Sequence, residues 1–351
     1  MCMSKSHKTT LRNWAVIAMT LVLAFVLAAC ASQSATTEAE PEPEPEAEAV
    51  EAEPVEPVEV RVASLKGPTS IGLASFIANV DSLELNNTYT FTIATAADEI
   101  LPSVIKGETD IALIPANAAA VLYNKTEGGI SVIDINTLGV LNVVTGDESI
   151  QQFSDLAGKT IYMTGKGATP EYAMNFLLDK AGITDVTLEF KSEPTEVVQA
   201  LSADATAVGV LPQPFATAAC VKNDALKAVI DLTDVWAASV DDGSQFLTGV
   251  TVVRNEFLAE HPEAVAEFIA QQAASVDVAN ADPAGVAPLV VSAGIIDAEP
   301  VAAKAIPSCH LVCITGTEMQ SALSGYLQTL FNSDPASVGG ALPADDFYFL
   351  G

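Results

Sequence analysis

The stretch Thr160–Leu178, TIYMTGKGATPEYAMNFLL, predicts a strand, a tight loop and a helix in direct succession. The strand covers Thr160–Thr164, the loop Gly165–Ala168, and the helix begins at Thr169-Pro170. A strand that ends in glycines and leads into a helix exposes backbone N–H groups, and the helix dipole adds partial positive charge at the same place. We therefore expect a small-ligand site at this junction.

The same arrangement occurs about one hundred residues earlier in the chain. Val60–Leu65 predicts a strand, Lys66-Gly67-Pro68-Thr69 a loop, and Ser70 the start of a helix. A second matched pair is formed by Asp110–Ala119 and Thr206–Phe215, each a buried strand that ends in proline and enters a helix. This spacing is too long for a solenoid repeat and favours two similar lobes that face each other across a cleft.

Strands alternate with helices along most of the chain, which predicts parallel βαβ units. The expected strands are Val60–Leu65, Thr88–Ala94, Asp110–Pro115, Ile130–Asn136, Gly139–Thr145, Thr160–Thr164, Val186–Lys191, Ala207–Leu211, Leu226–Leu232 and Phe246–Arg254. The expected helices include Ser70–Val80, Ala97–Gly107, Ala116–Lys125, Thr195–Ala203, Pro262–Val278, Val286–Gly294, Pro300–Ile306 and Gly316–Phe331. The predicted fold class is α/β with two lobes, each a doubly wound, mostly parallel sheet with helices on both faces.

The predicted lobes are discontinuous in sequence. We expect residues 60–143 plus 249–351 to form lobe I and residues 144–248 to form lobe II, with crossovers near Asn142–Gly146 and Gln245–Gly249. Half of the 351 residues are hydrophobic, which is enough for a sizeable core. The formal net charge of −30 makes nucleic-acid binding unlikely, because an acidic chain repels phosphate backbones.

Residues 1–29 have the pattern of a bacterial lipoprotein signal peptide. A basic segment with Lys5, Lys8 and Arg12 precedes the apolar run Trp14–Ala29, and Leu27-Ala28-Ala29-Cys30 resembles a lipobox. We expect cleavage before Cys30 and diacylglycerol on its thiol, which anchors the protein to the outside of the cell membrane. The alternatives are an ordinary secretory signal followed by a chance cysteine, or an uncleaved anchor.

Residues 30–59 predict a disordered acidic tether between the lipid anchor and the folded body. Ala31–Glu59 contains ten Glu and several Pro but no Lys or Arg, so it cannot bury a core and its charges repel one another. Alternating Pro and Glu favour extended polyproline II conformation. The segment lifts the body off the membrane or acts as a solubilising spacer.

Parallel sheets bind ligands outside the carboxyl ends of their strands. In two facing lobes this rule brings together the loops that follow the matched strands. The candidate ligand-binding residues are Lys66, Gly67, Thr69, Ser70, Pro115, Asn117, Gly165, Lys166, Gly167, Ala168, Thr169, Gln213 and Phe246. The two lysines would complement an anionic or zwitterionic ligand, or else they are solvated loop residues. Glu171, in the first turn of its helix, could satisfy that helix end itself and weakens the case for an anion.

No catalytic or metal-binding pattern stands out in the predicted mature chain. His261 lies in a Glu-rich helix start. His310 lies in Cys309-His310-Leu311-Val312-Cys313, where a fourth metal ligand is not evident and buried free thiols beside an ordinary histidine are the simpler interpretation. A disulfide between Cys309 and Cys313 stays open as an alternative. We expect no metal, no cofactor and no catalytic residues.

Five motifs resemble one family of proteins. They are Asp155-Leu-Ala-Gly-Lys-Thr-Ile, Gly165-Lys-Gly-Ala-Thr-Pro-Glu-Tyr, Lys66-Gly-Pro-Thr, Ile306-Pro-Ser-Cys and Leu342-Pro-Ala-Asp-Asp-Phe-Tyr. The family is the substrate-binding lipoproteins of ABC transporters in the nitrate/sulfonate/taurine and thiamine-pyrimidine-precursor superfamily. This resemblance implies the two-lobed periplasmic-binding-protein type II fold, a permease with a cytoplasmic ATPase as partner, and a solute such as a sulfonate, a nitrate- or bicarbonate-like anion or a pyrimidine-like compound.

The chain departs from this family at one candidate position. Members more often carry an acid where this chain has Gln213, which puts ligand contacts there in question. The cysteine-rich motif of the yeast-type pyrimidine synthase relatives is absent from the sequence. The alternatives to a transport protein are an enzyme on the same fold, of the pyrimidine-synthase or menaquinone-pathway type, and a ligand-sensing surface lipoprotein.

Overall fold

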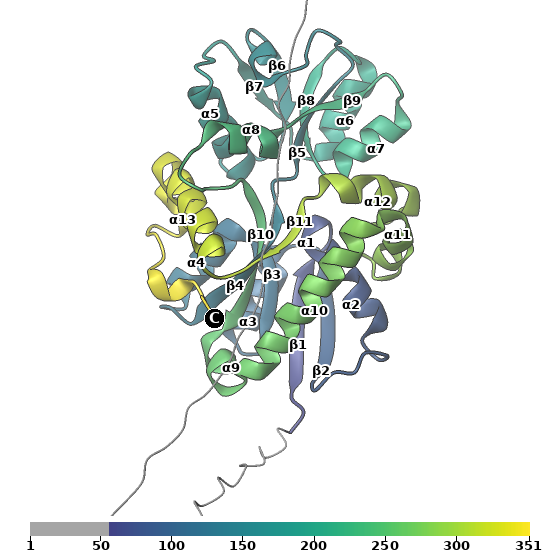
Figure 1. The fold of residues 1–351 in the computed structure, drawn as a ribbon. Helices are drawn as coiled ribbons and strands as arrows, with labels where there is room; N and C mark the ends of the chain where they lie inside the picture. Colours follow the sequence, from purple (N-terminus) through teal and green to yellow (C-terminus); the bar gives the residue numbers. More distant parts are fainter. Residues whose placement is uncertain (1–55) are drawn as a thin grey trace, which may run out of the picture. The chain divides into compact units, whose positions relative to one another are not determined.

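The computed structural model describes residues 56–351, which belong to one compact unit (Figure 1). The predicted signal peptide, Cys30 and most of the predicted tether lie outside the described residues. The strands are β1 (Glu59–Leu65), β2 (Thr88–Ala94), β3 (Ile111–Pro115), β4 (Ile130–Leu138), β5 (Leu141–Thr145), β6 (Thr160–Met163), β7 (Thr187–Phe190), β8 (Val208–Pro212), β9 (Lys227–Asp231), β10 (Leu247–Arg254) and β11 (Leu311–Ile314).

Helices occupy much of the remaining chain. The α-helices are α1 (Pro68–Ile71), α2 (Ala74–Asn79), α3 (Ala97–Ile105), α4 (Ala116–Lys125), α5 (Thr169–Lys180), α6 (Pro194–Ala203), α7 (Phe215–Lys222), α8 (Leu232–Ser239), α9 (Asn255–Glu260), α10 (Pro262–Ala281), α11 (Pro283–Ser292), α12 (Glu299–Ala305) and α13 (Gly316–Ser333). Short 3-10 helices are η1 (Phe153–Leu156), η2 (Ile306–Ser308), η3 (Pro335–Val338) and η4 (Asp345–Phe347).

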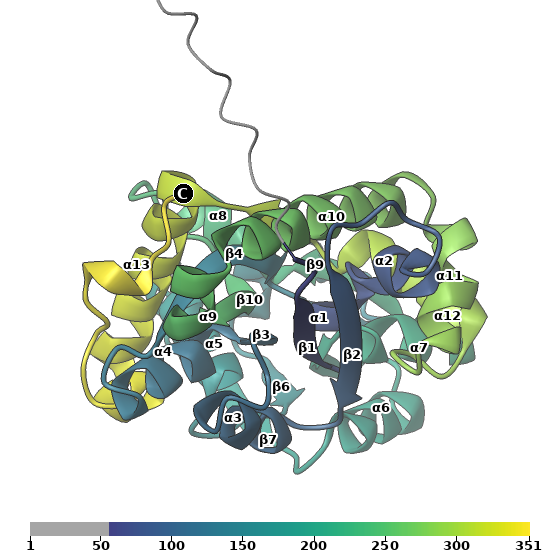
Figure 2. The same cartoon turned by 90° about the horizontal axis from the view of Figure 1, so that it is seen from below.

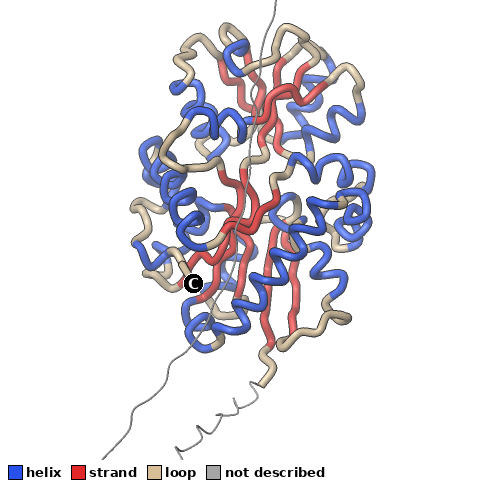
Figure 3. The backbone as a smooth tube through the Cα atoms, in the orientation of Figure 1, coloured by secondary structure: helices blue, strands red, loops and turns tan. Residues whose placement is uncertain are grey.

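The strands form two sheets, each flanked by helices (Figure 3). The first sheet has the order β11-β4-β10-β3-β1-β2, and the second has the order β7-β6-β8-β5-β9. These sheets confirm the predicted α/β class with helices on both faces. The pairing, however, is mixed rather than mostly parallel.

The antiparallel pairs involve the strands next to the passages between the sheets. β10 runs antiparallel to β3 and β4, and β5 runs antiparallel to β8 and β9, whereas β1 is parallel to β2 and β3. A strand that enters from the other sheet does not follow a helical βαβ crossover within its own sheet, so nothing requires it to be parallel. The prediction of mostly parallel sheets missed this because it extended the βαβ pattern to every strand.

Strand β3 shows why the first sheet is buried on both faces. Ile111 and Leu113 pack in one cluster with Phe76 of α2 and Phe268 of α10. Ala112 and Ile114 point the other way, into a cluster that includes residues of α3, α4 and α13. Figure 2 shows these two groups of helices on either side of the first sheet. The continuous apolar run of β3 is thus the pattern of a strand covered on both faces.

The second sheet is covered in the same way by four helices. Leu211 and Val144 pack with α6 and α7, while Val210 and Val143 belong to the cluster that contains residues of α5 and α8. That last cluster also contains Tyr326 of α13, so one apolar core continues from the first sheet to the second.

The chain leaves the first sheet after Leu138 and returns to it at Leu247. The predicted lobe boundaries at 143/144 and 248/249 stay a prediction. Strand β5 belongs to the second sheet and begins at Leu141, which the prediction had placed in lobe I.

Several elements differ from the expected ones. The predicted helix Ser70–Val80 is two short helices separated by Gly72 and Leu73. At Gly72 an added Cβ would lie 2.8 Å from Val276 Cγ2 of α10. Helices α8 and α9 and strand β11 were not expected. Cys309 and Cys313 are free thiols, so the possible disulfide is not formed. Within residues 56–351, no helix combines the length and hydrophobicity that a membrane span requires.

Candidate functional site

A pocket of about 190 Å³ lies between the two sheets. Its walls come from both sheets, from the chain segments that connect them and from α13. The lining residues are Pro115, Asn117, Val140, Leu141, Thr169, Pro170, Pro212, Phe246, Leu247, Thr248 and Tyr326. Among the thirteen predicted site residues, the pocket brings together Pro115, Asn117, Thr169 and Phe246.

Strand ends and helix starts place the first group of these side chains. Pro115 ends β3 and Asn117 lies in the first turn of α4, while Pro212 ends β8. Thr169 and Pro170 begin α5. Three of the four loops that the sequence predicted therefore meet at this pocket, and the loop Lys66–Ser70 contributes none of its lining.

The connecting segments supply the second group, which sequence reasoning largely missed. Val140 and Leu141 follow the first passage between the sheets, and Leu247 and Thr248 follow the second. The sequence predicted crossovers near these positions, and that prediction could have identified them as pocket residues. Tyr326 carried no such signal, because its place in the pocket depends on where α13 packs.

Aromatic rings form a wall behind the pocket. Trp236 of α8 stacks on Phe246 with ring centroids 5.6 Å apart and lies 5.8 Å from Tyr326 and 4.4 Å from Phe176. Trp236, Phe246 and Tyr326 are all buried. Because these rings come from α5, α8, α13 and the second connection, they join the two halves of the fold directly beside the pocket.

The loop after β1 uses its polar groups internally. Gly67 N donates to Ile295 O at 3.1 Å, and Ser70 Oγ donates to Ser64 Oγ at 2.6 Å. Thr69 is buried, whereas Lys66 is exposed and does not line the pocket. The predicted contact of these residues with a ligand stays untested.

The loop before α5 also has an internal partner. Gly167 N donates to Glu171 Oε2 at 2.5 Å, and Ala168 N donates to Gly165 O at 3.0 Å. Glu171 thus takes up one backbone donor at this helix start, in line with the expectation that it partly satisfies that end. Lys166 is exposed and, like Gly165, Gly167 and Ala168, lies outside the pocket lining.

The side-chain amide of Gln213 also has a hydrogen-bond partner within the protein. It is buried, and its Oε1 accepts from Thr217 Oγ1 at 2.8 Å and from Thr217 N at 3.3 Å. It does not line the pocket.

Polar contacts between the two halves flank the pocket. Tyr172 Oη on α5 donates to Asp334 Oδ2 at 2.9 Å, just beyond the end of α13. His310 lies beside the first connection, with Nδ1 2.7 Å from Gly139 O and Nε2 3.4 Å from Asp231 Oδ2 at the end of β9. These contacts join residues of the two halves at two separate places.

The pocket is uncharged along its lining. Its polar side chains are an amide, two threonine hydroxyls and one phenol: Asn117, Thr169, Thr248 and Tyr326. Burial raises the pKa of Tyr326, and a hydrogen bond with Thr169 only partly opposes that rise, so the phenol is neutral at physiological pH. Asn117 Nδ2 donates to Ser337 O at 3.3 Å.

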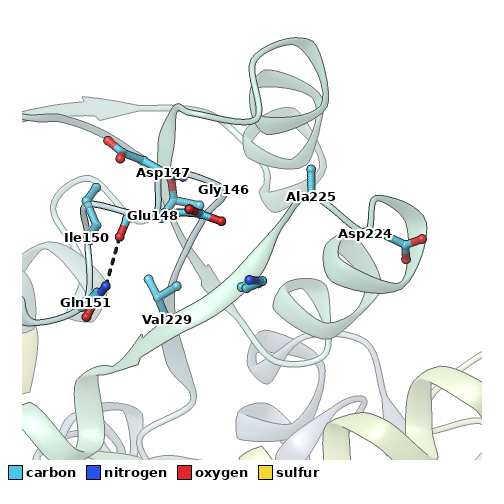
Figure 4. Close-up of a pocket in the computed structure, with 10 residues that line it drawn as sticks. Gly146, Asp147, Glu148, Ile150, Gln151, Asp224, Ala225 and Val229 are labelled. Carbon is cyan, nitrogen blue, oxygen red and sulfur yellow. Dashed lines mark hydrogen bonds between the residues drawn. The ribbon is translucent and has the colours of Figure 1, made fainter.

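A larger pocket of about 530 Å³ lies at the other end of β5 (Figure 4). It is built from one sheet alone, by the loop after β5 and the segment that leads into β9. Of its three acidic residues, Asp147, Glu148 and Asp224, the first already accepts from Lys159 Nζ at 2.9 Å and from Ser149 Oγ at 2.6 Å. Gln151 Nε2 donates to Glu148 O at 3.2 Å. We prefer the pocket between the sheets as the functional site, because there the matched loops of both sheets converge.

Within residues 56–351, no group of three or more His, Cys, Asp or Glu side chains is arranged to hold a metal ion. His310 contacts a backbone carbonyl and one carboxylate, as described above. Cys309 Sγ lies 3.1 Å from Ala305 O.

The chain is similar to known solute-binding proteins. The family described as the periplasmic phosphonate substrate-binding protein of ABC transporters matches residues 78–235. Curated binding proteins of Brucella abortus and Brucella suis are 27% identical over 164 residues, which are 46% of this chain and 49% of each relative. The chain thus spans about half the length of the curated relatives it matches.

Solved structures extend the likeness to nearly the whole described body. An ABC transporter protein from Parabacteroides distasonis has a TM-score of 0.70 at 24% identity and covers 83% of this chain and 98% of its own. The periplasmic aliphatic sulphonate binding protein SsuA from Escherichia coli has a TM-score of 0.63 at 12% identity and covers 82% of this chain and 92% of its own. At these identities the structural likeness establishes the type II fold.

Proposed function

We propose that the chain is a member of the nitrate/sulfonate/taurine and thiamine-pyrimidine-precursor superfamily of ABC-transporter substrate-binding proteins, and that it captures a small organic solute between two lobes and delivers it to an importer. The partner is a membrane permease coupled to a cytoplasmic ATPase. One observation carries the proposal: loops from both sheets converge on a single pocket between them. A solute held there contacts both halves at once.

The proposed mechanism is closure of two lobes around the solute. A solute that contacts Asn117 and Thr169 together bridges groups that move apart when the lobes separate. The closed form then has contacts that the open form lacks, so binding shifts the population towards closure. The permease recognises the closed form. The polar contact between Tyr172 and Asp334 and the aromatic wall around Trp236 support a closed form that is stable in itself.

The superfamily suggests several solute classes. They are sulfonates, nitrate- or bicarbonate-like anions and pyrimidine-like compounds. We propose Pro115, Asn117, Thr169 and Phe246 as ligand contacts from the predicted set, and we add Thr248 and Tyr326 because they supply hydroxyl groups to the same pocket.

Native mass spectrometry of the purified full chain tests the proposal. We expect a one-to-one complex with a small solute, and loss of that solute in Thr169→Trp, whose bulky ring would fill the pocket. The matched control is Thr195→Trp, because Thr195 also follows a strand, lies beside a proline in the first turn of a helix, and is exposed outside the pocket. Equal loading of both variants, or no captured solute in the unmodified chain, would contradict the proposal.

We also propose that the protein is extracytoplasmic and anchored to the membrane by lipid on Cys30. The lipobox and the acidic tether support this, although they lie outside the described residues. Cells fed an alkyne fatty acid should label the processed chain that begins at Cys30, and Cys30→Ser should abolish the label while Cys2→Ser keeps it. Labelling that persists in Cys30→Ser would contradict the anchor.

A further inference from the structure

The lining of the pocket between the sheets bears on which solute it accepts. None of its eleven residues is a lysine, arginine, histidine, aspartate or glutamate. Its polar groups are the amide of Asn117 and the hydroxyls of Thr169, Thr248 and Tyr326. Amides and hydroxyls donate and accept hydrogen bonds without carrying charge. The remaining lining is aliphatic, proline or aromatic.

A fully charged solute would lose its hydration here without gaining a counter-charge. Transfer of an ionised group out of water is costly unless the group is paired. Lys66 and Lys166, which lie in two of the matched loops, are exposed and lie outside the pocket lining.

The charges around the pocket disfavour anions in particular. Glu171 already accepts from Gly167 N at the start of α5, so this backbone donor is taken by a carboxylate of the chain itself. The chain as a whole has a formal net charge of −30. Its field repels a free anion on approach.

The volume of the pocket limits the size of the solute. An engineered apolar cavity of about 150 Å³ binds benzene. At about 190 Å³, this pocket has room for one six-membered ring with small substituents. The rings of Phe246 and Tyr326, 6.3 Å apart, offer apolar surface to such a ring.

We propose that the pocket accepts an uncharged single-ring solute with hydrogen-bonding substituents and discriminates against sulfonates, phosphonates and nitrate. This inference rests on the proposed function and narrows its solute class. The amide and hydroxyl groups orient the substituents, and the aromatic and aliphatic lining holds the ring. Anions are excluded because the pocket lining contains no positively charged side chain to pair with them.

Calorimetric titration of the full chain with matched probes tests this inference. The uncharged probes are nicotinamide, benzamide and uracil, and the anionic probes are nicotinate, benzenesulfonate and methylphosphonate. We expect at least one uncharged probe to bind at least tenfold more tightly than every anion. Tighter binding of an anion, or no binding of any uncharged probe, would overturn the inference.

Two variants of lining residues test whether the probes bind in this pocket. Tyr326→Phe should weaken the uncharged probe about three- to tenfold, whereas Tyr162→Phe, a tyrosine on β6 outside the lining, should leave it unchanged. Thr169→Lys adds the missing cation and should shift preference towards nicotinate, and Thr195→Lys should not. An unmodified chain that already prefers nicotinate, with binding abolished by Thr169→Trp, would refute the solute class and leave the proposed function standing. Probe binding that Thr169→Trp does not affect would refute both.

Discussion

Asp134 is a fully buried carboxyl group in the core of the first sheet. Its Oδ1 accepts from Thr251 Oγ1 at 2.9 Å and Gln272 Nε2 at 2.8 Å, while Oδ2 has no partner. Burial raises the pKa of Asp134 to about 7, and the two hydrogen bonds only partly oppose it. The native state therefore retains a proton that the unfolded chain releases at a lower pH. The stability from this group is fully present below the unfolded pKa of about 4 and is lost as pH rises towards 7.

Asp134→Asn should remove this pH dependence. Relative to the unmodified chain, the free energy of unfolding of the variant should increase between pH 4.5 and pH 8, by up to about 1.4 kcal/mol per pH unit. Urea denaturation at both pH values measures the difference. Asp147→Asn is the control, because hydrogen bonds from Ser149 and Lys159 lower the pKa of Asp147 to about 2. Its contribution is lost only as pH falls below the unfolded pKa of about 4, so this variant should differ from the unmodified chain by the same amount at pH 4.5 and pH 8. If the free energy of unfolding of Asp134→Asn differs from that of the unmodified chain by the same amount at both pH values, the raised pKa of Asp134 is contradicted.

At the scale of elements, one carboxylate joins three strands of the first sheet. Asp110, buried just before β3, accepts from Arg61 Nε of β1 at 2.8 Å and from Arg254 Nη2 of β10 at 3.0 Å. Burial tends to raise the pKa of Asp110, but the hydrogen bonds from Arg61 and Arg254 outweigh it and lower that pKa. Loss of the carboxylate would leave two guanidinium groups without their shared partner.

Asp110→Asn should lower the free energy of unfolding by about 2–4 kcal/mol, somewhat less than for a fully buried pair because Arg61 is partly exposed. Glu256→Gln is the matched control on the same arginine. Arg254 Nη1 lies 2.8 Å from Glu256 Oε2, but the Glu256 side chain is 73% exposed, so its loss should cost less than about 1 kcal/mol. Denaturant unfolding compares the two. An equal decrease in the free energy of unfolding in both variants would show that burial does not strengthen the contribution of Asp110 to stability.

The individual strands and helices show how much of the fold the sequence could predict. The alternating TYTFTIA and the proline-bounded helix after DIALIP correspond to β2 (Thr88–Ala94) and α4 (Ala116–Lys125) without a shift. Strand β11 was missed because four residues, LVCI, carry too little pattern, and it forms by pairing with β4 far away in sequence. Cys309, just before this strand, and Cys313, within it, suggested a disulfide or a metal instead. Local pattern thus predicts elements, and distant pairing does not show in it.

The residues of the candidate site also fall into those that local sequence patterns predict and those that depend on distant packing. Asn117 and Thr169 could be named from sequence because each follows a predicted strand-to-helix junction. Lys66 and Lys166 were named for their charge, but a sequence does not show which way an exposed side chain points. Tyr326 enters the pocket only through the packing of α13 against α5, which joins residues about 150 positions apart.

At the scale of the whole molecule, the bond between Tyr172 and Asp334 joins the two halves beside the pocket. Tyr172 Oη also lies 3.0 Å from Gly167 O, so Tyr172→Phe removes both contacts, and the loss of the one to Asp334 should favour opening. We expect amide hydrogen exchange in residues 165–172 and 334–340 to accelerate about two- to tenfold, which corresponds to one lost hydrogen bond. Mass spectrometry of the full chain measures the rates, with Tyr162→Phe as the control. Unchanged exchange in both segments would show that this contact does not hold the halves together.

Gly139 lies in the first connection, between β4 and β5. An added Cβ would lie 2.3 Å from Phe246 Cδ1 and 2.5 Å from Thr233 Oγ1. Phe246 cannot move aside easily, because Trp236 stacks on it. The methyl group of Gly139→Ala should therefore separate the connection from α8 and distort the floor of the pocket.

We expect Gly139→Ala to lower the free energy of unfolding by about 1–3 kcal/mol and to reduce solute capture. Gly129→Ala is the control, since Gly129 is exposed and its tightest side-chain neighbour is Thr126, at 3.0 Å from the added Cβ. Denaturant unfolding and native mass spectrometry separate the two effects. A variant that loses stability but keeps its solute would show that the floor of the pocket tolerates the shift. A variant that keeps both would show that the connection is loose enough to accept a methyl group, against the tight junction described here.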